Sequence, residues 1–474
     1  MKVHIKWSMV WLVAKRELRD QLRDWRILFP LLLLTLLFPV LMNVATYYAI
    51  NLVDKYGATL IADRLPPFFL MVVGFFPMTV SLVVALESFV GEKERGTIEP
   101  LLSSPLGDWE LYLGKFAASM IPPLAGSYLS IGIYLLILLY QGTRLPDLDI
   151  TLILLLLTTV QAILMVSAAV VISTQSTSVR SANLLASFIV IPAALLIQGE
   201  TGLIFWGNNS ILWFAIGAIL IMTALLMRLG VAHFERESLL GREIDLLNLR
   251  WIGQTFWQSF WGQGRSLAGW YRVQVLGKLK RLVVPILIVC AVGAVCFAAA
   301  YAWTIRYLPQ IIGQISTEEL GAEMARALNL PIDVPITFPF ILGYNLRAVA
   351  IISAFGVFSF GVLGVLGYAT NILLIGAALA VFSILGFSPL SVFLAGILPH
   401  GIFEIPALII SCAVVLYMGA VLVTPDRRKT LGEVMISALG DWACIHLGLV
   451  LPLLAAAAAI ETWITPLILF KTIL

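Results

Sequence analysis

His400 and Glu404 are side chains whose types and spacing suggest chemistry inside an apolar environment. They lie four residues apart in the long apolar run 389–423, so on a helix they share one face. An ionised group at the centre of a bilayer costs at least about 2.5–3.5 kcal/mol, which a pair reduces by sharing a proton or a hydrogen bond. The pair therefore either lines a polar cavity or proton path, or belongs to a buried network that holds broken helices together.

Four further polar residues are candidates for the same intramembrane cluster: Asn345, Arg347, Asn371 and Glu461. A zinc site needs three or four ligands, and the segment around His400 supplies one convincing pair. The segment also lacks the second histidine of the zinc-protease motif. The sequence therefore predicts neither a metal site nor a catalytic residue here.

A second candidate is a charged stretch, broken by glycine, between two apolar runs. Its residues are Glu92, Lys93, Glu94, Arg95, Gly96 and Thr97, followed by Glu99, Pro105 and Gly114-Lys115. Taken alone, this pattern describes a solvated loop that joins two membrane spans.

Nucleotide chemistry is not expected from this chain. Gly114-Lys115 is followed by Phe116 rather than by Ser or Thr, so the phosphate-binding loop is not formed. A nucleotide-binding domain needs roughly 200 residues of mixed strands and helices, and no polar stretch is that long. We therefore expect no cofactor on this chain.

The composition of the chain indicates which class of fold holds these candidate residues. The chain has 474 residues, of which 60% are hydrophobic and only 12% charged, and its mean hydropathy is +0.98. Soluble proteins carry about 25% charged residues, and each helical span needs about 20 apolar residues. We predict an all-α polytopic membrane protein, and the net charge of +3 is too small to indicate nucleic acid.

About eleven transmembrane helices are predicted. The apolar runs are 28–50, 66–88, 116–140, 150–173, 184–197, 211–229, 282–304, 346–366, 368–386, 389–423 and 443–465. The polar interruption between Gln198 and Ser210 suggests a partly re-entrant outer segment in the first half.

Two basic, tryptophan-containing segments are predicted to lie at the membrane surface. Residues 1–27 form an amphipathic helix, either in the inner interface or packed on a cytosolic partner. Residues 230–281 read as cytosolic interfacial helices and divide the chain into a domain at 1–229 and another at 282–474. Because Lys and Arg favour the inner side, we expect the N-terminus inside and residues 305–343 outside.

The charged stretch carries a family resemblance. Glu92 to Thr97, then Glu99-Pro100-Leu101-Leu102, Pro105 and Gly114-Lys115, resemble the loop between the second and third spans of type-2 ABC transporter permeases of the sodium-efflux and multidrug type. The resemblance implies that residues 92–112 contain a short coupling helix that contacts a separate ATPase. It also implies a homodimer or a pair with a related permease.

The second half of the chain carries a second family resemblance. Asn345-Leu346-Arg347, the glycine-rich run 358–367, Asn371, the segment 398–407 and Ala459-Ile460-Glu461 resemble the stage II sporulation protein M family. The chain therefore looks like a fusion. We expect a permease subunit, rather than an enzyme, of an ABC exporter in a bacterial or archaeal cell membrane. The alternative is a non-transporting membrane scaffold for envelope remodelling, regulated by an ATPase.

Overall fold

The computed structural model describes residues 6–55, 62–176, 178–206, 211–232, 249–262, 266–312, 337–424 and 429–468. Over these residues the regular secondary structure is entirely helical, which confirms the predicted all-α class. The chain divides into two compact units, Met1–Leu247 and Asn248–Leu474.

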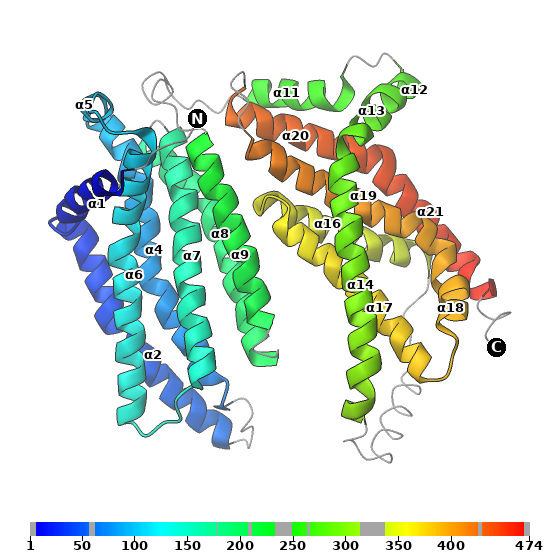
Figure 1. Ribbon diagram of the computed structural model, residues 1–474, viewed down its shortest axis with the longest axis horizontal. Coiled ribbons are helices and arrows are strands. Elements are labelled where there is room, and N and C mark those ends of the chain that lie inside the picture. The colour runs from blue at the N-terminus through cyan, green and yellow to red at the C-terminus, as the bar shows by residue number, and fades with distance from the viewer. Residues whose placement is uncertain are drawn as a thin grey trace. The chain divides into compact units, whose positions relative to one another are not determined.

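Unit 1 is a bundle of long helices with two short ones at one end. Its elements are α1 (Trp7–Gln21), α2 (Trp25–Lys55), α4 (Leu65–Glu94), α5 (Ile98–Leu102), α6 (Asp108–Tyr140), α7 (Leu148–Gln175), α8 (Val179–Trp206) and α9 (Ile211–Ala232). Helix α4 packs against α2, α6, α7 and α8. Helices α1 and α5 lie at the end of the bundle where α4 stops and α6 begins (Figure 1).

Helix α1 is amphipathic, as the sequence predicts. Val10, Val13 and Ala14 are buried, whereas Trp7 and Trp11 are exposed. Apolar side chains that face outward on a helix with a basic face are typical of a helix lying in a membrane interface.

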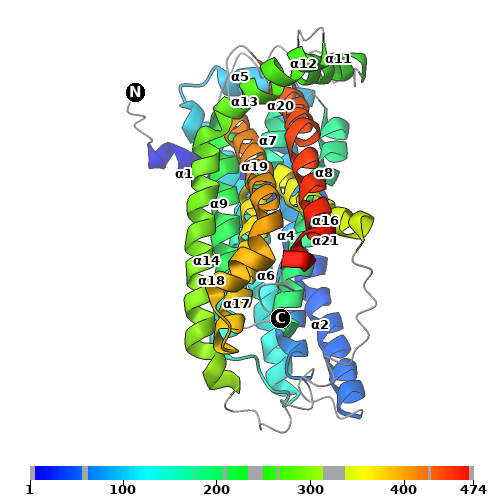
Figure 2. The same ribbon diagram turned by 90° about the vertical axis from the view of Figure 1, so that its right-hand side faces the viewer.

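Unit 2 is built from helices interrupted by turns. Its elements are α11 (Leu249–Trp261), α12 (Leu267–Trp270), η1 (Tyr271–Val275), α13 (Leu276–Leu279), η2 (Lys280–Leu282), α14 (Val283–Ile312), α16 (Phe338–Phe358), α17 (Val362–Ile384), α18 (Pro389–Val392), η3 (Phe393–Ile397), α19 (Leu398–Leu422), α20 (Leu431–Ile445), η4 (His446–Val450) and α21 (Leu451–Trp463). Helix α11 packs on α20 (Figure 2). Lys278 and Ser259 both bind Asp441 of α20, at 2.8 and 2.9 Å.

Ten helices among the described residues are long and apolar enough to cross a membrane. The remaining predicted span, 184–197, lies within α8, which has 28 residues. The expected break at Gln198 is wrong, because α8 continues to Trp206. Gln161 of α7 donates a hydrogen bond to Oε2 of the buried Glu200, which gives this carboxylate one partner without a break in the helix. Its Oε1 has no hydrogen-bond partner among the described residues. Residues 207–210 of the predicted interruption lie outside the described residues.

The boundary between the predicted runs 346–366 and 368–386 is also corrected. Helix α16 ends at Phe358 and α17 begins at Val362, so the turn falls inside the glycine-rich run. Gly361 has φ +92°, and a Cβ there would lie 2.7 Å from the Cα of Leu416 on α19. Glycine is required by both the backbone conformation and the close approach. Most of the loop predicted at 305–343 lies outside the described residues.

Candidate functional site

A buried lysine anchors the charged end of unit 1. Lys115 of α6 is 1% exposed, and its Nζ lies 3.0 Å from Glu17 of α1 and 3.3 Å from Glu92 of α4. It also donates to the carbonyl of Ser88, at 2.8 Å. An ammonium group has three donors, so each has an acceptor, which offsets the cost of burying the charge. Lys115 therefore joins α1, α4 and α6.

The end of α4 is tied to two further helices. Lys93 Nζ donates to the carbonyls of Thr174 and Ser176 at the end of α7, at 2.9 and 3.0 Å. Glu94 accepts a 2.7 Å hydrogen bond from the amide of Val179, the first residue of α8. Helix ends leave carbonyls and amides without partners inside the helix, and these side chains satisfy them. A displacement of the end of α4 would therefore act directly on α7 and α8.

Helix α5 lies between these anchors with two distinct faces. Ile98 and Leu101 are buried in the apolar core of unit 1, whereas Glu99 and Pro100 are exposed. The preceding Gly96 has φ +69°, which lets the chain turn between α4 and α5. The helix thus presents Glu99 and Pro100 at the surface while Ile98 and Leu101 are held by the bundle.

The eight residues predicted for the coupling loop fall into two groups. Exposed positions are Arg95, Gly96, Thr97, Glu99 and Pro105, and Glu94 is exposed although it is bonded to α8. Glu92 and Lys93 are partly buried and make internal contacts. Sequence reasoning missed Glu17 and Glu110; the Glu110 carboxylate accepts from the amides of Gly107 and Lys6.

Gly114 explains how α1 reaches Lys115. A Cβ at Gly114 would lie 2.6 Å from the Cβ of Val13 on α1, closer than real Cβ atoms approach, so only glycine allows this contact. We expect Gly114→Leu to loosen α1 from α6 and to raise the rate of tryptic cleavage after Lys15 and Arg19, whose side chains are exposed but whose backbone is helical. Limited proteolysis of the purified protein measures this effect. An unchanged cleavage rate in Gly114→Leu would contradict the packing role, and Gly132→Leu, with open space around it, is the matched control.

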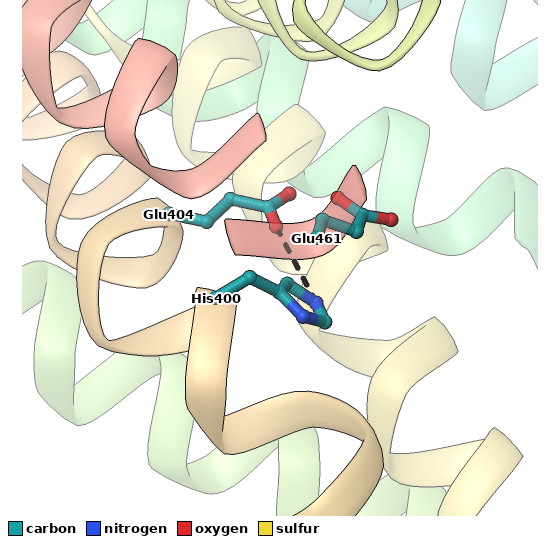
Figure 3. A group of neighbouring side chains, drawn as sticks. All are labelled: His400, Glu404 and Glu461. Carbon is teal, nitrogen blue, oxygen red and sulfur yellow. Dashed lines mark ion pairs between the residues drawn. The ribbon is translucent and has the colours of Figure 1, made fainter. Parts of the chain in front are cut away.

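A second cluster lies in unit 2, where α19 begins and α21 ends. His400 Nε2 is 3.9 Å from Glu404 Oε2, and one ligand atom from each of His400, Glu404 and Glu461 lies within 4.8 Å of the others. Figure 3 shows the three side chains converging from two helices. They line a cavity of about 500 Å³ together with Asn345 of α16.

Two residues predicted for this cluster lie elsewhere. The guanidinium of Arg347 is 5.7 Å from the ring centroid of Tyr344, and Asn371 donates to the carbonyl of Gly367 in its own helix, at 2.8 Å. Neither belongs to the lining of the cavity, which does include Asn345, His400, Glu404 and Glu461.

His446 is a buried polar residue that sequence reasoning missed. Its Nε2 lies 2.9 Å from Ser411 Oγ of α19, and its Nδ1 is 2.9 Å from the carbonyl of Trp442. Trp442 in turn donates to Ser353 of α16, at 3.2 Å. The network joins three helices with both ring nitrogens paired, so its arrangement fits a structural role. In the sequence, the only indication of this network is a single histidine, His446, within the apolar run 443–465.

Comparison with known proteins agrees with both resemblances. Residues 11–201 match the family model for ABC-2 family transporter protein, and residues 286–466 match that for stage II sporulation protein M. The chain is 33% identical over 109 residues to a protein of Pseudomonas aeruginosa named probable ABC transporter permease protein NosY. It is 34% identical over 110 residues to the protein of that name from Stutzerimonas stutzeri.

Each of these matches covers 23% of this chain and spans only 38% of the relative's length. The predicted pair of families is nevertheless confirmed along the chain, because the two family matches lie in the halves where the two motifs occur. The chain therefore contains one segment that matches the model for ABC-2 family transporter protein and a second that matches the model for stage II sporulation protein M.

Proposed function

We propose that this chain is the membrane subunit of an ABC exporter, driven by a separate ATPase that docks on residues 92–112. The observation that carries the proposal is α5. Its apolar residues Ile98 and Leu101 are held in the bundle, and Glu99 and Pro100 face outward. A short helix held in this way cannot move independently of the bundle. A docked protein that displaces α5 would therefore displace the bundle helices with it.

Side-chain contacts near α5 connect the end of α4 with four other helices and would carry this displacement to them. Glu92 and Lys115 connect α4 with α6 and α1, and Lys93 and Glu94 connect α4 with the ends of α7 and α8. Closure of an ATPase against α5 would thus tilt several helices together. The ATPase would bind the ATP and magnesium, and this chain would supply the path through the membrane.

Assembly and orientation follow from the same proposal. Two nucleotides are bound by two ATPase copies in such systems, and the described part of unit 1 supplies one set of six long helices. We therefore propose a homodimer or a pair with a related permease. The N-terminus and α5 would face the cytosol of a bacterial or archaeal cell, since the ATPase is there.

The test is a charge reversal on α5. Glu99→Lys should weaken capture of the co-expressed ATPase about tenfold or more, equivalent to about 1.4 kcal/mol, because an interface charge is inverted. Since Glu99 is exposed, its replacement should leave the thermal midpoint nearly unchanged. Glu94→Lys is a poorer choice, because it would also remove the hydrogen bond to Val179.

Asp149→Lys is the matched control, since it makes the same charge change at an exposed position at the start of α7. Equal ATPase capture by both variants and the wild type would remove the docking assignment.

The sporulation-type segment favours one alternative function, a membrane scaffold that an ATPase regulates and that transports nothing. Substrate-stimulated ATP hydrolysis by the reconstituted complex supports the exporter, and hydrolysis that no substrate changes supports the scaffold.

A further inference from the structure

The cavity at the start of α19 holds a set of groups that fits a metal ion. His400 offers an imidazole nitrogen, and Glu404 and Glu461 offer carboxylate oxygens, all within 4.8 Å of one another. Ligand atoms around a tetrahedral zinc ion lie about 2.0–2.2 Å from the metal, and therefore about 3.3 Å from each other. Small rotations of the two glutamate side chains would close the remaining difference.

The second nitrogen of His400 is already held. Nδ1 lies 3.2 Å from the hydroxyl of Thr465, a buried residue beyond α21. Metal-binding histidines almost always donate their other ring N–H to a carboxylate, a backbone carbonyl or water, which fixes the ring and aims the free nitrogen. The hydroxyl oxygen of Thr465 can accept from Nδ1 in the same way. The π-helical turn η3 ends at Ile397, three residues before His400. Turns of this kind frequently occur at functional sites.

Asn345 supplies an independent observation. Its side chain is 6% exposed and lines the same cavity, yet its Nδ2 has no hydrogen-bond partner. Leaving a buried donor unpaired costs about 1–3 kcal/mol, so a missing acceptor is expected at this position. A water or other oxygen ligand on a bound ion would accept this hydrogen bond.

We propose that His400, Glu404 and Glu461 bind a divalent transition-metal ion, with a fourth ligand held by Asn345. One imidazole and two carboxylates suit Zn²⁺, Mn²⁺ or Fe²⁺ better than Ca²⁺ or Mg²⁺, which take oxygen ligands. The ion would neutralise two neighbouring carboxylates in an apolar setting. It would also bind α19 to α21 and leave one coordination position facing the cavity.

The experiment uses the purified full chain in detergent, treated with a chelator and then titrated with Co²⁺. We expect about one Co²⁺ per chain, with the visible absorption of a four-coordinate site, and displacement by Zn²⁺. Zn²⁺ should raise the thermal midpoint of the wild type. Glu461→Gln should bind Co²⁺ at least tenfold more weakly and lose the zinc-dependent stabilisation.

Glu433→Gln is the matched control, because Glu433 is a partly buried carboxylate at the start of α20 that does not line the cavity. Asn345→Ala should keep the stoichiometry but alter the absorption, since it touches only the fourth ligand. If the wild type binds no stoichiometric Co²⁺ or Zn²⁺, the proposal is wrong. Equal binding by Glu461→Gln and Glu433→Gln would also overturn it. Should Glu461→Gln fail to fold, His400→Gln repeats the comparison, and the wild-type titration still decides.

Discussion

Lys115→Ala is expected to lower the free energy of unfolding by about 3–5 kcal/mol, because removing one partner of a buried ion pair leaves the other uncompensated. Here two carboxylates would lose their cation, since Lys115 contacts both Glu17 and Glu92. Their side chains are only 16% and 18% exposed, so water compensates little. The thermal midpoint of the purified chain, followed by helical circular dichroism, measures the loss.

Two further variants sharpen this test. Lys15→Ala removes an exposed lysine from α1 and should change stability by no more than about 0.5 kcal/mol. The triple variant Lys115→Met, Glu17→Gln, Glu92→Gln removes all three charges and should recover much of the loss, as neutral replacement of buried ion pairs often does. A Lys115→Ala protein as stable as the wild type would show that the ion pairs contribute nothing measurable.

Gly419→Leu is expected to have the largest effect in unit 2. A Cβ at Gly419 on α19 would lie 2.0 Å from the carbonyl oxygen of Phe360, in the turn between α16 and α17. Overpacking a core costs typically about 1–3 kcal/mol, and a clash with backbone should reach or exceed the upper value. The variant should unfold at a lower temperature, or fail to accumulate in the membrane.

The matched control is Gly343→Leu on α16, where no atom lies within 4 Å of the added Cβ. It should be neutral or slightly stabilising, because leucine favours helix more than glycine does. Equal thermal midpoints for the two variants would mean that the turn moves freely away from α19, against the close contact seen here.

Several features of this chain are determined by its sequence alone. Runs of about 20 apolar residues can only be helices in a bilayer, because every backbone polar group must be satisfied within the segment. The all-α class follows from this local rule, and the amphipathic α1 follows from helical periodicity, which places its apolar and basic residues on different faces. The charged loop with Gly96 and Glu99 is equally visible, since charges and glycine mark where a span ends.

Tertiary structure decided which side chains meet. Glu17 and Lys115 are 98 residues apart in sequence and form an ion pair, and Glu461 reaches His400 from another helix. Helical periodicity reports the face on which a residue lies and does not report the helix that covers that face. For the same reason the sequence places Asn371 in a cluster that it does not join, and predicts an interruption at Gln198 where the structure has continuous helix. Polar residues in a membrane are satisfied by partners that only the packed bundle brings into reach.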